Sequence, residues 1–442
     1  MKKTRYALVG TGGRGIGMFA KPLVDEYGDV AELVGLCDIN PKRLEHAVAS
    51  VGKQVPTFTD FDRMLREVDC DAVIVTTKDS THHEFIIKAL EAGKDAITEK
   101  PMTVDDEKCR QILAAEERTG RSVRVTFNYR YAPYATKVKE LLASGVIGEI
   151  YSVDFHWFLD TVHGADYFRR WHRQKANSGG LFVHKATHHF DLVNWWLDQE
   201  PVSVYAVGTR RFYGPTRKER GERCLTCDYK NSCEFYLDLS ANESLRKLYL
   251  EAESEDGYFR DRCVFADEID IEDTMAAVVT YSRGTVMTYS LHAYMPFEGY
   301  RIAFNGSKGR LEAGVPETFL TQNMPNFADR SRSRKRLDPI LYLHGETEPG
   351  DNEIRIYPVF GGAEIIKVPH GGKGHGGGDT RLRDMLFRPG VPDPLGHAAG
   401  SRAGALSILV GVAANYSIQR KAPVQIAELM GGYKGSVPKA AS

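Results

Sequence analysis

One eight-residue stretch of the sequence brings together three imidazoles, an ammonium and a carboxylate: His184-Lys185-Ala186-Thr187-His188-His189-Phe190-Asp191. On a helix, with about 100° between successive residues, positions 184, 188 and 191 fall within roughly 60° of one another. An imidazole can take up and return a proton near pH 7, so His184 and His188 are candidates for acid–base catalysis. Asp191 could orient His188 or bind a substrate hydroxyl, and Lys185 flanks the shared face. The stretch predicts an acid–base platform on one helix.

Two other interpretations of this stretch stay open. His184 and His188 lie four residues apart, which is a spacing used by metal ligands on a helix. The ammonium of Lys185 beside them would repel a metal cation, which argues against a metal site. The three histidines could also form a merely structural cluster. We favour the acid–base platform over both.

A second group of reactive side chains lies in a segment of about 210–265. Its four cysteines are spaced Cys224-x2-Cys227-x5-Cys233, with Cys263 thirty residues later. Four cysteines with one C-x-x-C pair are typical of a closed, tetrahedral zinc site that holds an insertion together. The sequence predicts a structural zinc site here, with reduced thiols or an iron–sulfur cluster as alternatives.

The candidate catalytic residues must be positioned by strands, helices and turns. A glycine turn near the start of the chain is the first of these elements. Residues 5–10 form an apolar run that predicts a buried strand, and Gly10, Gly12 and Gly15 then fit the pattern G-x-G-x-x-G. A helix is expected next, although Pro22 should kink it, and a second strand ends at Asp38. Strand, glycine turn, helix, strand and terminal acid form the arrangement that binds dinucleotides.

Asp38 bears on which dinucleotide is bound. Its carboxylate would accept hydrogen bonds from the adenosine ribose and would repel a 2′-phosphate, so we expect NAD rather than NADP. Lys42 and Arg43 follow closely and keep NADP open as an alternative.

Strands and helices continue to alternate as far as residue 126. Such alternation predicts a parallel, doubly wound sheet that binds its ligand at the carboxyl ends of the strands. Thr77, Glu99 and Lys100 lie at such ends. For Lys100 the plain alternative is a solvated lysine at the end of a strand.

Four motifs occur in order along the chain: "TTKDSTHH" at 76–83, "EKPM" at 99–102, "NYRYAP" at 128–133 and "GGLFVHKATHHFD" at 179–191. With the glycine turn, they make the chain resemble the glucose–fructose oxidoreductase / inositol dehydrogenase / MocA family. The resemblance implies an α/β protein with an N-terminal Rossmann domain (1–126) and a C-terminal α/β domain on a large, mostly antiparallel sheet (127–442). It also implies NAD(P)-dependent oxidation or reduction of a sugar, glycoside or polyol, in a homodimer or homotetramer joined through that sheet.

The resemblance assigns roles to particular residues. Lys100 matches the family's catalytic lysine, with a cis peptide bond to Pro101, and His188 matches its histidine. His184 stands where the family usually has an acid, which puts one member of the usual lysine–aspartate–histidine set in doubt. His82 matches a family histidine, with helix capping or packing as its alternative role. One branch of the family, the NAD-dependent glycosidases, oxidises its substrate only transiently, and this activity is the alternative function.

The residues expected to bind the cofactor are Gly10, Gly12, Gly13, Arg14, Gly15, Asp38, Thr77, His82, Glu99, Lys100 and Asn128. Aromatic and cationic side chains mix between residues 161 and 180, as in many carbohydrate sites. The residues expected to bind the substrate are Arg130, Tyr131, His163, Tyr167, Arg170, Trp171, Lys185, Asp191 and His375.

The composition excludes several classes of partner. Lysine plus arginine number 58 and aspartate plus glutamate 59, so no overall charge attracts nucleic acid or an anionic membrane. No window approaches the roughly 18 apolar residues that span a bilayer. The short apolar run at the start predicts a strand rather than a signal peptide. We therefore expect a cytoplasmic protein with reduced cysteines and a small-molecule substrate.

Overall fold

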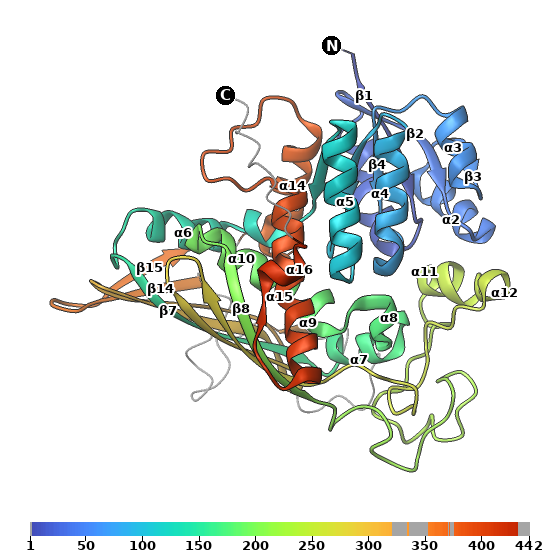
Figure 1. The fold of residues 1–442 in the computed structure, drawn as a ribbon. Coiled ribbons are helices and arrows are strands. Elements are labelled where there is room, and N and C mark those ends of the chain that lie inside the picture. Colours follow the sequence, from blue (N-terminus) through green and yellow to red (C-terminus); the bar gives the residue numbers. More distant parts are fainter. Residues whose placement is uncertain (1, 321–333, 336–351, 370, 372–374, 432–442) are drawn as a thin grey trace.

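The computed structural model describes residues 2–320, 334–335, 352–369, 371 and 375–431 (Figure 1). Two sheets organise these residues, one of seven strands and one of ten. The first sheet is parallel apart from one short strand, and the second is mostly antiparallel. This arrangement confirms the predicted fold class.

The first sheet has the strand order β16-β6-β5-β4-β1-β2-β3. Its strands are buried on both faces, as parallel strands between helices must be. The strands are β1 (Thr4–Val9), β2 (Ala31–Cys37), β3 (Thr57–Phe58), β4 (Ala72–Val75), β5 (Asp95–Thr98), β6 (Val123–Val125) and β16 (Ala399–Gly400). The connecting helices are α2 (Pro41–Val51), α3 (Phe61–Glu67), α4 (His82–Glu91) and α5 (Asp106–Thr119).

The helix after the glycine turn differs from the expected one. Residues Gly15–Ala20 form a π-helical turn, η1, and an α-helix, α1, follows over Lys21–Asp25. Pro22 lies in the first turn of α1, directly after the wider π-helical turn. The change of helix type at this point explains how Pro22 is accommodated without breaking the segment.

The second sheet has the order β15-β14-β12-β11-β7-β10-β9-β8-β17, with β13 pairing to β12. Its strands are β7 (Ile150–Asp160), β8 (Pro201–Thr209), β9 (Thr274–Tyr281), β10 (Val286–Met295), β11 (Phe297–Gly306), β12 (Gly309–Leu320), β13 (Arg334–Lys335), β14 (Asn352–Pro358), β15 (Glu364–Val368) and β17 (Val424–Gln425). Only β7 and β10 pair in parallel among the described strands of this sheet.

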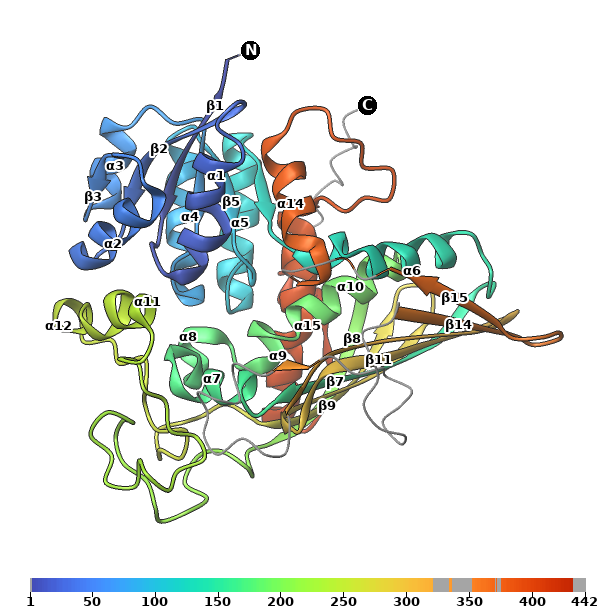
Figure 2. The same ribbon diagram turned by 180° about the vertical axis from the view of Figure 1, so that it is seen from behind.

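One face of the second sheet is covered by helices (Figure 1, Figure 2). The covering helices include α6 (Pro133–Ala143), α9 (Leu181–His184), α10 (Thr187–Leu197) and α15 (Ser401–Arg420). Several large apolar side chains of the strands are exposed, among them Tyr205 and Val207 of β8 and Val278 of β9. Among the described residues, no helix is both long and apolar enough to cross a bilayer.

Two segments connect the halves of the molecule. After β15 the chain returns to the first sheet, where β16 pairs antiparallel with β6 and α14 (Gly378–Phe387) packs beside β1. The cysteine-rich insertion lies between β8 and β9. It carries α11 (Glu243–Leu245), the π-turn η5 (Arg246–Leu250) and α12 (Glu253–Asp256), which lie next to α2 in both views (Figure 1, Figure 2).

Candidate active site

The glycine turn has the geometry that a dinucleotide site requires. Gly10 has a φ of +94°, and a Cβ there would lie 2.6 Å from the backbone of Thr76. A Cβ on Gly15 would collide with the carbonyl oxygen of Gly10, whereas no atom lies within 4 Å of the Cβ position of Gly12. Gly10 and Gly15 therefore close the turn, and Gly12 leaves open space on the side where a pyrophosphate would approach.

Asp38 ends β2 and holds the glycine turn in place. Its Oδ2 accepts from the backbone N–H of Thr11 at 2.8 Å, and its Oδ1 accepts from that of Asn40 at 2.9 Å. A carboxylate has about four acceptor positions, so the group keeps capacity for a ribose hydroxyl.

Two more residues predicted to bind the cofactor, Arg14 and His82, contact the segment that follows β5. Arg14 Nε donates to Glu99 Oε1 at 2.7 Å, which ties the glycine turn to the segment after β5. The ring nitrogens of His82 lie 2.9 Å from the carbonyl oxygen of Pro101 and 3.1 Å from that of Thr77. Both nitrogens thus face backbone, so the packing alternative for His82 is the one that the structure supports.

Asn128 and the glycine-rich loop meet at the edge of this site. Asn128 Nδ2 donates to Asp379 Oδ1 at 2.6 Å, and Asp379 Oδ2 lies 3.8 Å from Arg14 Nη1. The side chain of His375, in the same loop, lies outside the described residues.

Lys100 lies at the carboxyl end of β5, and its peptide bond to Pro101 is cis. Its Nζ donates to the carbonyl oxygen of His184 at 3.3 Å. Burial lowers the pKa of Lys100 to about 8, with the carboxyls of Asp79 and Glu99 acting in the opposite direction. The solvated-lysine interpretation fits less well, because the side chain is partly buried and its ammonium group is bonded to a backbone carbonyl oxygen.

His184 pairs with a carboxyl group that the sequence did not single out. Its Nδ1 lies 2.5 Å from Oδ2 of Asp79, just after β4. Burial raises the pKa of Asp79 well above its ordinary value and lowers the pKa of His184 well below its own. Both shifts have the same cause, because each group is removed from water and its charged form is disfavoured. Asp79 lies within "TTKDSTHH", at the end of a strand, which was the only signal for it.

The prediction that residues 184–191 form one helix is wrong. Helix α9 ends at His184 and α10 begins at Thr187, with Lys185 and Ala186 between them. Because of this break, the side chains of His184 and Lys185 point in different directions. His184 faces Asp79, whereas the Lys185 Nζ lies 4.6 Å from the centre of the Trp157 ring, against the second sheet.

His188 stays near His184 despite the break. Its ring packs edge-on against Tyr129, with 4.7 Å between ring centres, and it is almost fully buried. The charges of Lys100 and of His188 both act on His184 and lower its pKa, after the larger effect of burial. His189 turns away, stacking on Trp157 at 3.9 Å.

Asp191 and Arg130 bind each other instead of facing the site. Arg130 Nε and Nη2 donate to the two carboxylate oxygens of Asp191 at 2.7 and 2.6 Å, and both side chains are buried. Asp191 therefore does not share a face with His184 and His188, and the expected substrate role of these two residues has no support in this geometry. Tyr131 packs on His397 with 5.2 Å between ring centres, likewise in the interior.

His163 and Tyr167 form a chain with a second carboxylate that sequence reasoning missed. The Tyr167 hydroxyl lies 2.7 Å from His163 Nε2, and His163 Nδ1 lies 2.6 Å from Glu298 Oε1. Glu298 is buried in β11, and its Oε1 also lies 4.0 Å from Lys185 Nζ. The Tyr167 ring lies 5.2 Å from the His184 ring, so the chain begins beside the acid–base groups. A glutamate at an inward position of an alternating strand was its only sequence signal.

The aromatic and cationic loop also reaches His184. His172 stacks on Trp171 at 3.6 Å, and its ring lies 4.2 Å from that of His184. The charge of Arg170 acts on the pKa values of both Asp79 and His184. The Trp171 ring lies 5.9 Å from that of His184, and the substrate-binding role of Trp171 and Arg170 stays a prediction.

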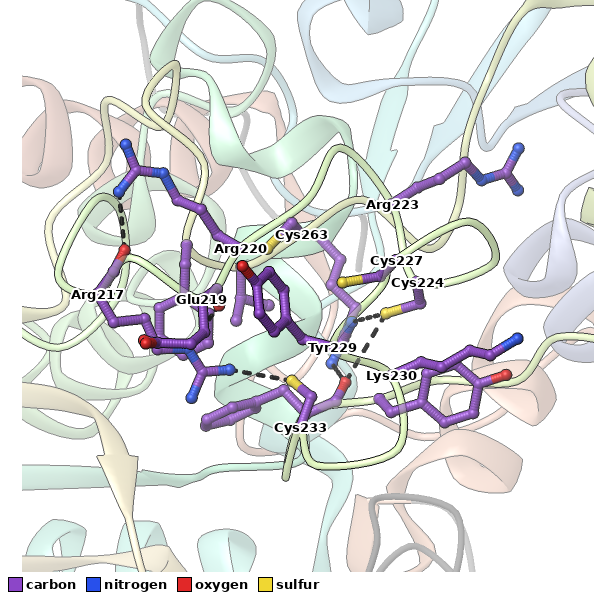
Figure 3. Close-up of a pocket in the computed structure, with 15 residues that line it drawn as sticks. Arg217, Glu219, Arg220, Arg223, Cys224, Cys227, Tyr229, Lys230, Cys233 and Cys263 are labelled. Carbon is purple, nitrogen blue, oxygen red and sulfur yellow. Dashed lines mark hydrogen bonds between the residues drawn. The ribbon is translucent and has the colours of Figure 1, made fainter.

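The four cysteines of the insertion line one pocket (Figure 3). Arg169 Nη1 donates to Cys224 Sγ at 3.2 Å, and Arg217 Nη2 donates to Cys233 Sγ at 3.0 Å. In the part of the chain that the structure describes, no three His, Cys, Asp or Glu side chains are grouped so that they could hold a metal ion. The predicted zinc site is thus not supported, and Cys224, Cys227, Cys233 and Cys263 fit the reduced-thiol alternative.

Models of one oxidoreductase family match both halves of the chain. The GFO_IDH_MocA NAD-binding Rossmann fold matches residues 4–127, and its C-terminal alpha/beta domain matches residues 139–338. YteT of Bacillus subtilis (strain 168), named as a candidate oxidoreductase, is 39% identical over 440 residues, covering 95% of this chain and 97% of YteT. Inositol 2-dehydrogenase of Rhizobium meliloti (strain 1021) is 32% identical over 203 residues, covering 46% of this chain and 58% of that enzyme.

Solved structures share the fold over nearly the whole chain. The WlbA dehydrogenase of Bordetella pertussis, in complex with NADH and UDP-GlcNAcA, has a TM-score of 0.63 at 19% identity, covering 96% of this chain and 99% of WlbA. An oxidoreductase domain protein from Kribbella flavida has a TM-score of 0.66 at 17% identity, covering 96% and 100%. The family models and the match to YteT show that this chain belongs to the glucose–fructose oxidoreductase / inositol dehydrogenase / MocA family of NAD-binding oxidoreductases.

Proposed function

We propose that this oxidoreductase transfers a hydride between NAD and a hydroxyl-bearing carbon of a sugar, glycoside or polyol. The observation that carries the proposal lies at the carboxyl ends of β4 and β5, where Lys100 donates to the carbonyl oxygen of His184 and the His184 ring pairs with Asp79. The pKa of Lys100, lowered to about 8 by burial, makes this lysine able to accept and return a proton under ordinary conditions.

In this proposal, side chains of the protein transfer the hydroxyl proton, and the cofactor accepts the hydride. Bound NAD supplies the hydride acceptor. Lys100, held against the carbonyl oxygen of His184, positions the substrate hydroxyl. Lys100 or His188 takes the hydroxyl proton as the carbon gives up its hydride. The contact between Asp79 and His184 fixes the orientation of the imidazole.

The chain from Tyr167 to Glu298 offers the proton a route out of the site. Tyr167 lies beside His184, and the His163 side chain is one third exposed. Because successive polar atoms lie 2.6–2.7 Å apart, the Tyr167 hydroxyl can pass its proton to His163 as it accepts another proton from the site.

The substrate class rests on the mixture of rings and cations around the same point. Trp171 offers a flat ring to the C–H face of a sugar, and Arg170 can donate to hydroxyl groups. The names of similar proteins point the same way, since they include inositol 2-dehydrogenases and a dehydrogenase bound to a nucleotide sugar acid.

We also propose that the protein is a homodimer or homotetramer joined through the second sheet. Tyr205 pairs with Val278 across neighbouring strands, and Val207 follows two residues later on the same face as Tyr205. These three apolar side chains are exposed, at 43%, 41% and 55% for Tyr205, Val278 and Val207. An exposed apolar patch on an open sheet is typical of a protein–protein interface.

The test is an assay of the purified protein against a panel of sugars, glycosides, polyols and inositols with NAD. We expect NADH to form with at least one of these substrates and the Lys100→Met variant to be inactive while it still binds NAD. Absence of NADH with every substrate, from a folded protein that binds NAD, would refute the proposal. Release of an aglycone without net NADH would identify the alternative, an NAD-dependent glycosidase.

A further inference from the structure

A segment of the cysteine-rich insertion lies against the nucleotide-binding domain. We call residues 243–256, which contain α11, η5 and α12, the strap. In both views the strap lies below α2, although it is inserted between two strands of the other domain (Figure 1, Figure 2). Its partners are the residues that open α2, so the contact lies just after the end of β2.

Hydrogen bonds and ion pairs join the strap to residues 40–43. Asn40 Nδ2 donates to the carbonyl oxygen of Ala252 at 2.9 Å. Lys42 Nζ lies 3.2 Å from Glu255 Oε1 and donates to Ser254 Oγ at 2.9 Å.

Arg43 is enclosed by the strap. Its Nη1 lies 2.5 Å from Asp256 Oδ2 and 3.8 Å from Asp38 Oδ1, and its Nε donates to the carbonyl oxygen of Leu248 at 3.4 Å. The side chains of Arg43 and Asp256 are only 11% and 12% exposed. Arg43 Nη2 is buried and has no hydrogen-bond partner among the described residues. The guanidinium thus keeps an unused donor that is covered by the strap.

The strap also reaches the glycine turn. A Cβ on Gly13 would lie 3.4 Å from the Tyr249 hydroxyl and 3.6 Å from Leu248 Cδ2. The strap therefore touches the two elements between which the adenosine half of a dinucleotide lies, the glycine turn and the segment after Asp38. The far end of the insertion is anchored, because Arg223 pairs with both Glu253 and Asp261 at 2.9 and 2.7 Å.

The charges in this contact bear on the choice of nucleotide. A 2′-phosphate on the adenosine ribose is normally bound by a cation near the end of β2. Lys42 and Arg43 are the cations in that position, and the strap places Glu255 and Asp256 on them. The same carboxylates would repel a phosphate that approached Asp38.

We propose that the strap is part of the cofactor site and makes the enzyme selective for NAD over NADP, with Asp256 and Glu255 as the specificity-determining residues. This inference rests on the proposed NAD-dependent function. Glu255 and Asp256 of the strap form ion pairs with Lys42 and Arg43, the two cations that would bind a 2′-phosphate. They also place two negative charges beside the position of that phosphate. The cysteine-rich insertion is then the support that holds the strap on α2.

The experiment compares the affinities for NAD and NADP by calorimetry on the full-length protein. We expect the wild type to prefer NAD. In the double variant Glu255→Gln, Asp256→Asn, the ratio of NADP affinity to NAD affinity should rise about tenfold or more, since one charge-assisted hydrogen bond from Arg43 becomes available to the phosphate. The single variant Glu255→Gln should show a smaller rise and is the safer variant, because that side chain is 34% exposed.

Glu243→Gln is the matched control. Glu243 also belongs to the strap, but it is 73% exposed and pairs only with Lys247 of the same segment among the contacts that the structure describes. It should leave the affinity ratio unchanged. Equal affinity of the wild type for both nucleotides, or an unchanged ratio in folded strap variants, would overturn the inference. A wild type that bound neither nucleotide would instead refute the proposed function.

Discussion

At the scale of single residues, the site is built from groups whose charges are set by burial. Lys100 was predictable, because the sequence places it after a strand and before a proline in a recognisable motif. Asp79 and Glu298 were not, because each is identified by a partner far along the chain: His184 for Asp79 and His163 for Glu298. A single sequence shows which residues are acidic but not which imidazole they will meet.

The lowered pKa of Lys100 predicts a pH dependence. Below about pH 8 the amine of Lys100 carries its proton and cannot accept another, whereas above it the amine is free to act as a base. We therefore expect kcat/KM for alcohol oxidation to rise as the pH increases through about 8. A pH profile of the oxidation rate measures this, and a profile that is flat from pH 7 to 9 would contradict a role for Lys100 as the base.

The Tyr167–His163–Glu298 chain predicts a defect in proton transfer. Glu298→Gln keeps the shape of the side chain but removes the charge that orients His163, so we expect kcat to fall by roughly tenfold or more, within the range for acid–base groups, with little change in KM. The solvent deuterium isotope effect on kcat should increase. Glu364→Gln, at an exposed position of β15, is the control and should change neither quantity.

At the scale of elements, the largest difference between sequence and structure lies between α9 and α10. One helix over 184–191 was expected because helical spacing would bring His184, His188 and Asp191 onto one face, but such spacing does not show where the backbone turns. All eight residues are buried in the structure. A change from buried to exposed positions therefore does not mark the place where the helix breaks. The separate contacts of His184 with Asp79 and of Lys185 with Trp157 require it.

The ion pair between Arg130 and Asp191 fixes α10 to the short helix η3 (Asn128–Tyr131). Asp191→Ala should leave a buried guanidinium without its partner and lower the free energy of unfolding by about 3–5 kcal/mol. Replacing both residues, Arg130→Met with Asp191→Leu, should cost less than the single change. Thermal or denaturant unfolding measures both effects, with the exposed Asp228→Ala as control. Equal losses in the single and double variants would show that the cost does not come from an unpaired buried guanidinium.

At the scale of the whole molecule, the two-domain α/β organisation followed from the sequence, because alternating strands and helices and the shared motifs extend over both halves. The position of the strap could not be predicted from the sequence, because nothing in the composition of the insertion indicates that it packs against α2. The zinc prediction shows the same limit: four cysteines with suitable spacing line one pocket, yet the described side chains do not form a set of metal ligands.

The exposed patch on the second sheet predicts how the subunits associate. The double variant Tyr205→Asp, Val207→Asp places two charges on this face, and we expect it to convert the oligomer to a monomer, or a tetramer to a dimer. Light scattering coupled to size-exclusion chromatography measures the mass. Ile39→Ser changes another exposed apolar side chain, on the nucleotide-binding domain, and should leave the mass unchanged.

The return of the chain to the first sheet after β15 has a consequence for how the molecule can be divided. Phe387 of α14 packs edge-on against Tyr6 and Tyr27, at 5.1 and 5.3 Å between ring centres, and Asp384 accepts a hydrogen bond from the Tyr27 hydroxyl at 2.8 Å. A fragment that ended at residue 126 would lack these partners and would expose the edge of β6. We expect such a truncated nucleotide-binding half to be unstable or insoluble by itself, and to become an autonomous unit only when residues 375–400 are supplied in trans or fused to it.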